Sequence, residues 1–232
     1  MAFQKTVERR MKGATLRLTD GNDYSKNGEF CVILPFNGRF DLPKMTNSYY
    51  KGVREEVFRN DGAQKLASKI QSLQRELKSG VPQIEQKPGE PDWSFAKMSE
   101  GSESLQPGSV VMTEYSGMPF RGTTQRLLLA VMLTGDYDKN ANGLVLQETA
   151  ENCLKVAHDK KIESISFPLE VPHHGEVDFE DKAMAFFHAA WSFLREHKPE
   201  SNPVKTITFY MHNIYKQPLI CEAQRYFNNL FP

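Results

Sequence analysis

Residues 146–175, LQETAENCLKVAHDKKIESISFPLEVPHHG, contain the pattern that decides the fold. Their first part predicts a helix, because apolar residues recur at helical spacing: Leu146, Ala150, Cys153, Leu154 and Ala157. Ser164–Pro168 then predicts a buried strand that ends at its proline, which cannot donate to a ladder. A loop at 169–177 leads into a second amphipathic helix, whose apolar face holds Ala183, Phe187, Ala190, Trp191 and Leu194. Helix, buried strand, loop and helix form the corner of an open α/β sheet at which ligands bind.

The rest of the chain predicts further elements of the same kind. Strands are expected at 14–18, 30–34, 109–113, 127–133 and 204–211, the second of them ending at Pro35. Helical patterns cover 49–77, broken at 60–62, and 220–230. This order predicts a three-layer α/β/α fold with a mixed central sheet, helices on both faces and a single domain over 1–232.

Residues 80–108 differ in composition from the segments around them. They are rich in Pro, Gly, Ser, Glu and Lys, so we expect an inserted surface loop. Trp93 and Phe95 are its exceptions. They indicate either a patch that docks the loop on the body of the protein, the reading we favour, or a lid over a ligand.

Charge and composition exclude several classes of function. Lys+Arg and Asp+Glu both total 29, which gives no basic footprint for nucleic acid and no polybasic membrane signal. The N-terminus has no apolar core of a secretory signal, and the longest apolar run, 127–133, is too short to span a membrane. The three cysteines are widely spaced, which favours a reducing compartment. We therefore expect a cytoplasmic protein, or one delivered by a non-classical route, with no nucleic-acid partner.

Several strands carry recognisable motifs, namely "ESISFP" at 163–168, "GSVVMT" at 108–113 and "LAVMLTGDY" at 129–137. They resemble "SIAFP", "GxAVxT" and "VIHAVGPDY", three strand motifs of macro domains, the ADP-ribose-binding modules. The resemblance runs from about residue 14 to 230 outside the insert and implies the macro domain fold, with ADP-ribose or an ADP-ribosylated protein as partner and no cofactor.

The resemblance also implies ligand-binding residues. "GNDYS" at 21–25 lies on the family's "GDIT" motif and "ILPFN" at 33–37 on "VNAAN", while "YKGV" at 50–53 and "VPHHGE" at 171–176 replace the glycine-rich phosphate loops "GGGV" and "STGxxG". The implied ADP-ribose contacts are Asp23, Tyr24, Asn37, Lys51, Gly52, Val53, His174, Gly175, Glu176 and Tyr215. Asp23 would accept from the adenine amino group, Asn37 would lie beside the distal ribose, and Tyr215 would stack on adenine. One glycine remains in each phosphate loop, and Lys51 or the histidines could supply side-chain donors in place of the lost backbone approach.

Catalysis by such a site would be hydrolysis of the ADP-ribosyl–protein linkage, with Asn37 and Asp41 as the candidate catalytic residues. Purely structural roles for these residues stay open as alternatives. Asn37-Gly38 is a very good turn dipeptide, and Asp23 suits an Asx-turn. Adjacent His173 and His174 cannot easily face one ion, so no metal site is expected. A non-catalytic ADP-ribose reader and a macro-like interaction scaffold are the alternative functions.

Overall fold

The computed structural model describes residues 6–20, 30–40, 62–79, 91–100, 103–114, 124–134, 139–140, 142–169, 177–211 and 217–232. Its strands are β1 (Thr6–Met11), β2 (Ala14–Asp20), β3 (Phe30–Asn37), β4 (Asp92–Phe95), β5 (Val110–Glu114), β6 (Thr124–Thr134), β7 (Lys139–Asn140), β8 (Ser164–Pro168) and β9 (Thr206–Met211). Its helices are α2 (Gly62–Lys78), α3 (Gly143–Asp159), α4 (Phe179–Glu196) and α5 (Gln217–Leu230).

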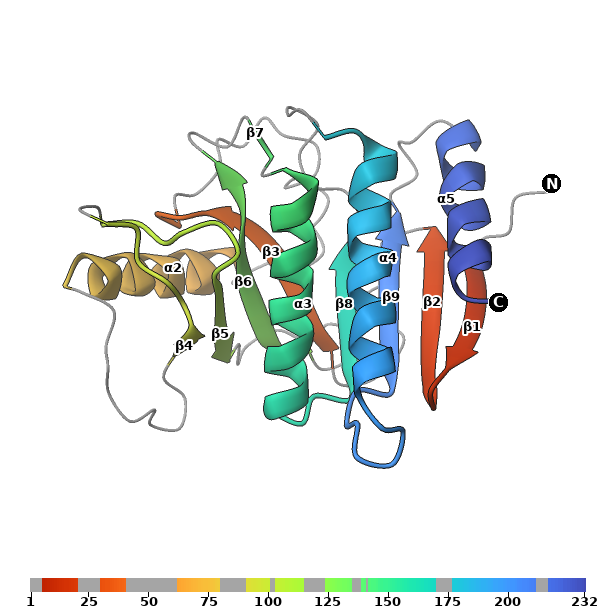
Figure 1. Cartoon of the computed structure of the whole chain (residues 1–232). Coiled ribbons are helices and arrows are strands. Elements are labelled where there is room, and N and C mark those ends of the chain that lie inside the picture. The colour runs from red at the N-terminus through yellow and green to blue at the C-terminus, as the bar shows by residue number, and fades with distance from the viewer. Residues whose placement is uncertain are drawn as a thin grey trace.

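The described strands form one mixed sheet, as the sequence predicts. Their order is β1-β2-β9-β8-β3-β6-β5-β4, and β7 pairs with β6 (Figure 1). Strands β2, β9, β8, β3 and β6 run parallel to one another. Strand β1 pairs antiparallel with β2 at one end, and β5 pairs antiparallel with both β6 and β4 at the other. The carboxyl ends of the parallel strands therefore meet at one edge of the sheet.

One face of the sheet is covered by α3, α4 and α5 (Figure 1). Period-2 alternation places Phe167 of β8 and Phe209 of β9 on this face, where they pack against aromatic rings of the helices. The main core gathers here, and its Phe187 contacts Phe227 of α5 with ring centroids 5.4 Å apart. We call this the helical face.

The opposite face holds a second set of buried apolar side chains. Alternate residues of β5 and β6 are buried but belong to no part of the main core: Val111, Leu127, Leu129 and Val131. Helix α2 lies on this side at the β4–β5 end of the sheet and buries Ile70, Leu73 and Leu77 (Figure 1). Helices on both faces give the three layers that the sequence predicts.

Three strand predictions were incomplete. Strand β3 continues through Pro35 to Asn37. It pairs with β8 only at Cys31 and Val32, so the missing N–H of Pro35 breaks no hydrogen bond to β8. The sequence analysis missed β1, an edge strand in which Val7 alone is fully buried. It also assigned all of 80–108 to a loop, whereas β4 joins the edge of the sheet beside β5.

Candidate functional site

The candidate site lies at the carboxyl edge of the parallel strands. Register pairs Asp20 with Met211 and Pro168 with Tyr210, so β2, β8 and β9 end level with one another. Strand β3 ends nearby at Asn37, which pairs with Leu133 of β6. Ligands of open α/β sheets bind at this edge, because the loops that follow the strands leave a crevice there.

Asn37 is the last residue of β3 and lies beside an irregularity in the sheet. The register of β3 against β6 shifts between Phe36 and Asn37, which leaves an extra residue on β6. Such a bulge twists a strand locally and changes the direction of the side chains beside it. The Asn37 side chain is buried, with 4% of the residue exposed.

The Asn37 amide also builds the turn that follows the strand. Its Oδ1 accepts a hydrogen bond from the Arg39 backbone N–H at 3.2 Å, and its backbone carbonyl accepts from the Phe40 N–H at 3.0 Å. This is the Asx-turn chemistry that the Asn37-Gly38 dipeptide predicts. The turn role of Asn37 is confirmed, since its side-chain oxygen and its backbone carbonyl both accept hydrogen bonds within the turn.

Gly38 allows another part of the chain to approach this turn. Its carbonyl accepts from the Leu105 N–H at 2.7 Å, and a Cβ added at Gly38 would lie 2.1 Å from the Leu105 carbonyl oxygen. No side chain fits in that space without moving the backbone. The insert and the Asn37 turn are therefore built against each other.

Phe40, at the end of the same turn, contacts both the insert and helix α2. Its buried ring meets Trp93 edge-on, with ring centroids 6.2 Å apart. Helix α2 contributes polar contacts, since Gln74 Nε2 donates to the Phe40 carbonyl at 3.1 Å and Glu76 Oε2 accepts from Trp93 Nε1 at 3.3 Å. Trp93 thus docks the insert on the body of the protein, the reading favoured over a lid.

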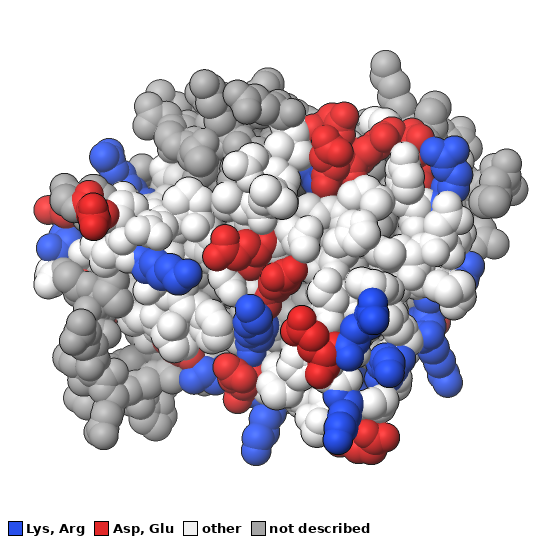
Figure 2. All heavy atoms as spheres, viewed as in Figure 1, with Lys and Arg blue, Asp and Glu red and all other residues white. Residues whose placement is uncertain are grey.

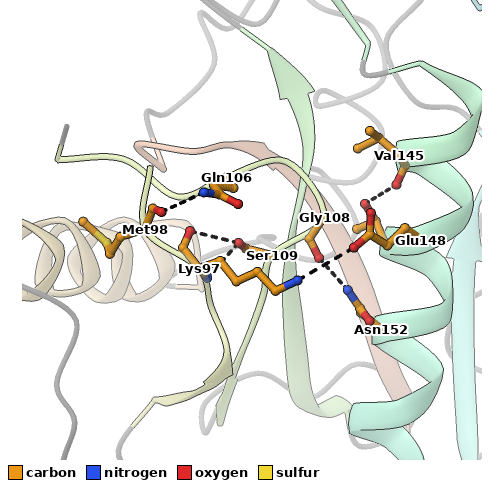
Figure 3. Close-up of polar contacts among 9 residues, drawn as sticks. Lys97, Met98, Gln106, Gly108, Ser109, Val145, Glu148 and Asn152 are labelled. Atoms are coloured by element: carbon orange, nitrogen blue, oxygen red, sulfur yellow. Dashed lines mark hydrogen bonds and ion pairs between the residues drawn. The ribbon is translucent and has the colours of Figure 1, made fainter. Parts of the chain in front are cut away.

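The insert is also tied to α3. Figure 3 shows Lys97 pointing toward Glu148, with Nζ and Oε1 3.9 Å apart, and Asn152 Nδ2 donating to the Gly108 carbonyl at 3.0 Å. Ser109 Oγ accepts from the Lys97 backbone N–H at 3.0 Å. At the far end of α3, Lys160 Nζ lies 2.6 Å from the largely buried Asp92 carboxylate. The insert therefore bridges α3 and the Asn37 turn.

The start of α4, which also lies at the carboxyl edge, is acidic. Asp178 caps the helix by accepting from the Asp181 N–H at 3.0 Å. The pKa of Glu180 is raised, chiefly because its carboxyl shares a hydrogen bond with Glu222 of α5. Acidic side chains near a helix N-terminus are favoured by the helix dipole, which accounts for this acidic group.

Lys182, one turn into α4, is the exception in this acidic group. The residue is only 2% exposed, and burial lowers the pKa of its ammonium group from 10.5 to about 8, although Asp178 opposes the shift. Sequence reasoning missed Lys182. The available signal was its spacing, since it continues the buried positions Ala185, Ala189 and Phe193 at i+3, i+7 and i+11.

The described part of the chain contains neither a candidate metal site nor a candidate membrane-spanning helix. No three His, Cys, Asp or Glu side chains of those residues gather to hold a metal ion. Among the described helices, none is long and apolar enough to cross a bilayer.

Comparison with known proteins gives a match in structure alone. Protein-family models and curated proteins provide no match to the sequence. The solved Oceanobacillus iheyensis macrodomain with MES bound is similar at a TM-score of 0.66 and 16% identity, over 98% of this chain and 99% of that one. A mutant of the same macrodomain with ADPR has a TM-score of 0.64 and 17% identity, over 97% and 98% of the two chains. The macro domain of ganglioside induced differentiation associated protein 2 has a TM-score of 0.59 and 15% identity, over 95% and 85%.

This chain has the macro domain fold. The likeness extends over nearly the whole chain. It confirms the fold that the strand motifs predict, and at this level of identity it carries no side-chain correspondence.

Only one of the predicted site residues of this chain lies among the described residues, namely Asn37. The others fall outside them: Asp23, Tyr24, Asp41, Lys51, Gly52, Val53, His174, Gly175, Glu176 and Tyr215. In sequence they follow β2, β3, β8 and β9, the strands that end at the carboxyl edge. Their assignment to a ligand remains a prediction.

Proposed function

We propose that this protein binds ADP-ribose, free or attached to a protein, at the carboxyl edge of its sheet. The observation that carries the proposal is the match over 97% of the chain to a macrodomain with ADPR. The position of Asn37 supports it, because the side chain lies at the end of β3 with its amide oxygen held by Arg39. We expect the Asn37 side chain to contact a ribose hydroxyl or a water molecule of the bound ligand.

We further propose that the protein hydrolyses the ADP-ribosyl–protein linkage. Water would add across the bond between the anomeric carbon and the protein atom, its hydroxyl going to carbon and its proton to the leaving atom. Asn37 would orient the water, and Asp41 would serve as general acid or base. The loops at Gly52 and Gly175 would hold the pyrophosphate, with Lys51, Val53, His174 and Glu176 around it, while Asp23, Tyr24 and Tyr215 would take the adenosine.

Calorimetric titration with ADP-ribose tests the binding proposal, with AMP and ribose 5-phosphate as controls. We expect micromolar affinity for ADP-ribose and at least about tenfold weaker binding of either fragment, because each makes only part of the contacts. No heat and no thermal shift at millimolar ADP-ribose would leave the interaction scaffold as the function of the fold.

Two substitutions at Asn37 separate its ligand role from its turn role. Asn37→Asp keeps an oxygen for the Arg39 N–H and removes the amide donor, whereas Asn37→Ala removes both. We expect Asn37→Asp to lose turnover of an ADP-ribosylated protein by about 10²-fold or more and to keep the turn, with a lower unfolding midpoint because its carboxylate is buried. Asn37→Ala should lose turnover and also about 1 kcal/mol of stability. Binding without turnover in the wild type would make the protein a reader, and full activity of Asn37→Asp would remove Asn37 from the mechanism.

A further inference from the structure

A second concave site lies at the opposite, amino edge of the sheet. Its volume is about 520 Å³, within the range of roughly 300–1,000 Å³ that is typical of small-molecule pockets. The residues that line it are Arg10, Met11, Lys12, Gly13, Thr15, Lys205 and Thr206. Three of these are cations, two carry hydroxyls, and none is acidic.

Lys12 is held by the turn that joins β1 to β2. Lys12 and Gly13 have φ values of +50° and +77°, as in the tight turns that join twisted antiparallel strands. The turn packs against the loop before β9, since a Cβ at Gly13 would lie 3.2 Å from Pro199 Cβ. The base of the Lys12 side chain is therefore fixed relative to β9.

Lys205 is held by neutral partners. Its Nζ donates to the Asn202 carbonyl at 2.6 Å and to the Pro199 carbonyl at 3.4 Å. An ammonium group has three N–H bonds, so one remains for a ligand. The two carbonyls position the group without neutralising its charge.

Arg10 stands beside the hydroxyls on the face of the sheet opposite α4 and α5. Register places Arg10 opposite Thr15, and Thr15 beside Thr206 of β9. Glu8, two residues along β1, is engaged by Arg17 at 2.6 Å and does not compensate Arg10. Neither Arg10 nor Lys12 forms an ion pair with another residue of the described part of the chain.

The row of hydroxyls continues from the cavity into the sheet. Ser164 of β8 pairs in register with Thr206, is 7% exposed, and its Oγ has no hydrogen-bond partner among the described residues. The neighbouring carboxylates, Glu163 and Glu200, are exposed and do not line the cavity. Figure 2 shows many Lys and Arg side chains along the lower right of the view, with Asp and Glu side chains among them, and a group of Asp and Glu at the upper right.

We propose that this cavity binds the phosphate group of a small phosphorylated molecule. Three cations and two hydroxyls, with no carboxylate among the described residues that line the cavity, match the charge and the acceptors of a phosphate dianion. The volume exceeds that of a phosphate alone, so the rest of the ligand also has room. The site is separate from the carboxyl edge and does not depend on the function proposed there.

Pyrophosphate and inorganic phosphate serve as probes, titrated into the full chain at constant ionic strength with acetate as the monovalent control. The test variant is Arg10→Gln/Lys12→Gln, in which both wild-type side chains are exposed. The matched control is Arg75→Gln/Lys78→Gln, which removes the same two charges from exposed positions on α2. We expect the test variant to bind pyrophosphate at least about tenfold more weakly than the wild type and the control to bind as the wild type does.

Two readouts locate the bound ion. In ¹⁵N-labelled protein, pyrophosphate should shift the amide resonances of Gly13, Thr15 and Thr206, and saturating ADP-ribose should leave these shifts in place. Equal binding by the test variant, or shifts confined to the Asn37–Phe40 turn, would overturn the proposal. Unfolding midpoints of the two double variants must agree with the wild type, and Lys12→Gln alone repeats the test if they do not.

Discussion

Strands β8, of five residues, and β9, of six, each present two chemically opposite faces. On the helical face, the Phe209 ring lies 4.9 Å from Phe187 and 5.7 Å from Phe167. On the other face, the hydroxyls of Ser164, Ser166 and Thr208 are buried and have no hydrogen-bond partner among the described residues. Both faces exclude solvent, so burial alone does not distinguish them.

The buried aromatic rings of one face stabilise the fold, whereas the buried hydroxyls of the other face lower its stability. Burying an aromatic ring is favourable in proportion to its area, whereas a buried hydroxyl without a partner costs about 1–3 kcal/mol. Few such groups occur in a native domain, and those that do require an explanation such as an ordered water or a functional role. Here the hydroxyls continue the row that begins at the amino-edge cavity.

Phe209→Ala is expected to produce the largest loss, because it removes a ring at the centre of the helical face. The residue is fully buried and contacts Phe167, Phe187 and Phe227. We expect the free energy of unfolding to fall by about 3–5 kcal/mol, as for other buried Phe→Ala changes. Urea unfolding followed by circular dichroism measures it, and a loss below about 1 kcal/mol would contradict the assignment of the main core to this face.

Lys182→Met tests the charged exception within the packed layer of α4. Because the folded pKa is about 8 and the usual value 10.5, the unfolded chain binds more protons between these pH values, and stability rises with pH there. Below pH 8 the full cost applies, about 3 kcal/mol as an upper value. Lys182→Met should therefore be more stable than the wild type at pH 7 by up to that amount.

The pH dependence of this difference distinguishes the cause. The stability gap between Lys182→Met and the wild type should shrink as pH rises from 8 to 10.5, since the wild-type lysine is then neutral in both states. Lys155→Met, at an exposed position of α3, controls for loss of a surface charge and should show no such trend. A gap that stays constant with pH would mean that packing, and not desolvation, separates the two proteins.

The same contrast explains which parts of the fold the sequence predicts. Strand β8 was placed at its observed bounds because it is buried on both faces and ends at Pro168. Strand β1 was missed because TVERRM buries Val7 alone and its pairing with β2 satisfies the backbone without a recognisable pattern. Edge strands leave a weak trace in sequence, since few of their side chains enter a core.

The candidate site is predictable only where its chemistry is local. The Asn37-Gly38 dipeptide predicts a turn, and the hydrogen bonds to Arg39 and Phe40 confirm it. The close approach of Leu105 to Gly38 joins segments far apart in the chain, and no spacing rule reveals such a contact. Lys182 and the amino-edge cations are likewise brought into place by tertiary packing, which periodicity alone does not specify.

Thr208→Val gives the smallest expected change and the sharpest comparison with Phe209→Ala, because the two residues are adjacent on β9 and face opposite ways. Valine replaces the unpaired hydroxyl with a methyl group of similar shape, so the free energy of unfolding should stay constant or rise by about 1 kcal/mol. Urea unfolding beside Phe209→Ala measures it. A fall of more than about 1 kcal/mol would mean that the hydroxyl is bonded in solution, most simply by a water bridging Thr208 and Ser166, which pair in register. In that event the polar face of β8 and β9 would stabilise the fold through its hydration. Both faces would then raise the free energy of unfolding, one by burying apolar rings and the other by binding water.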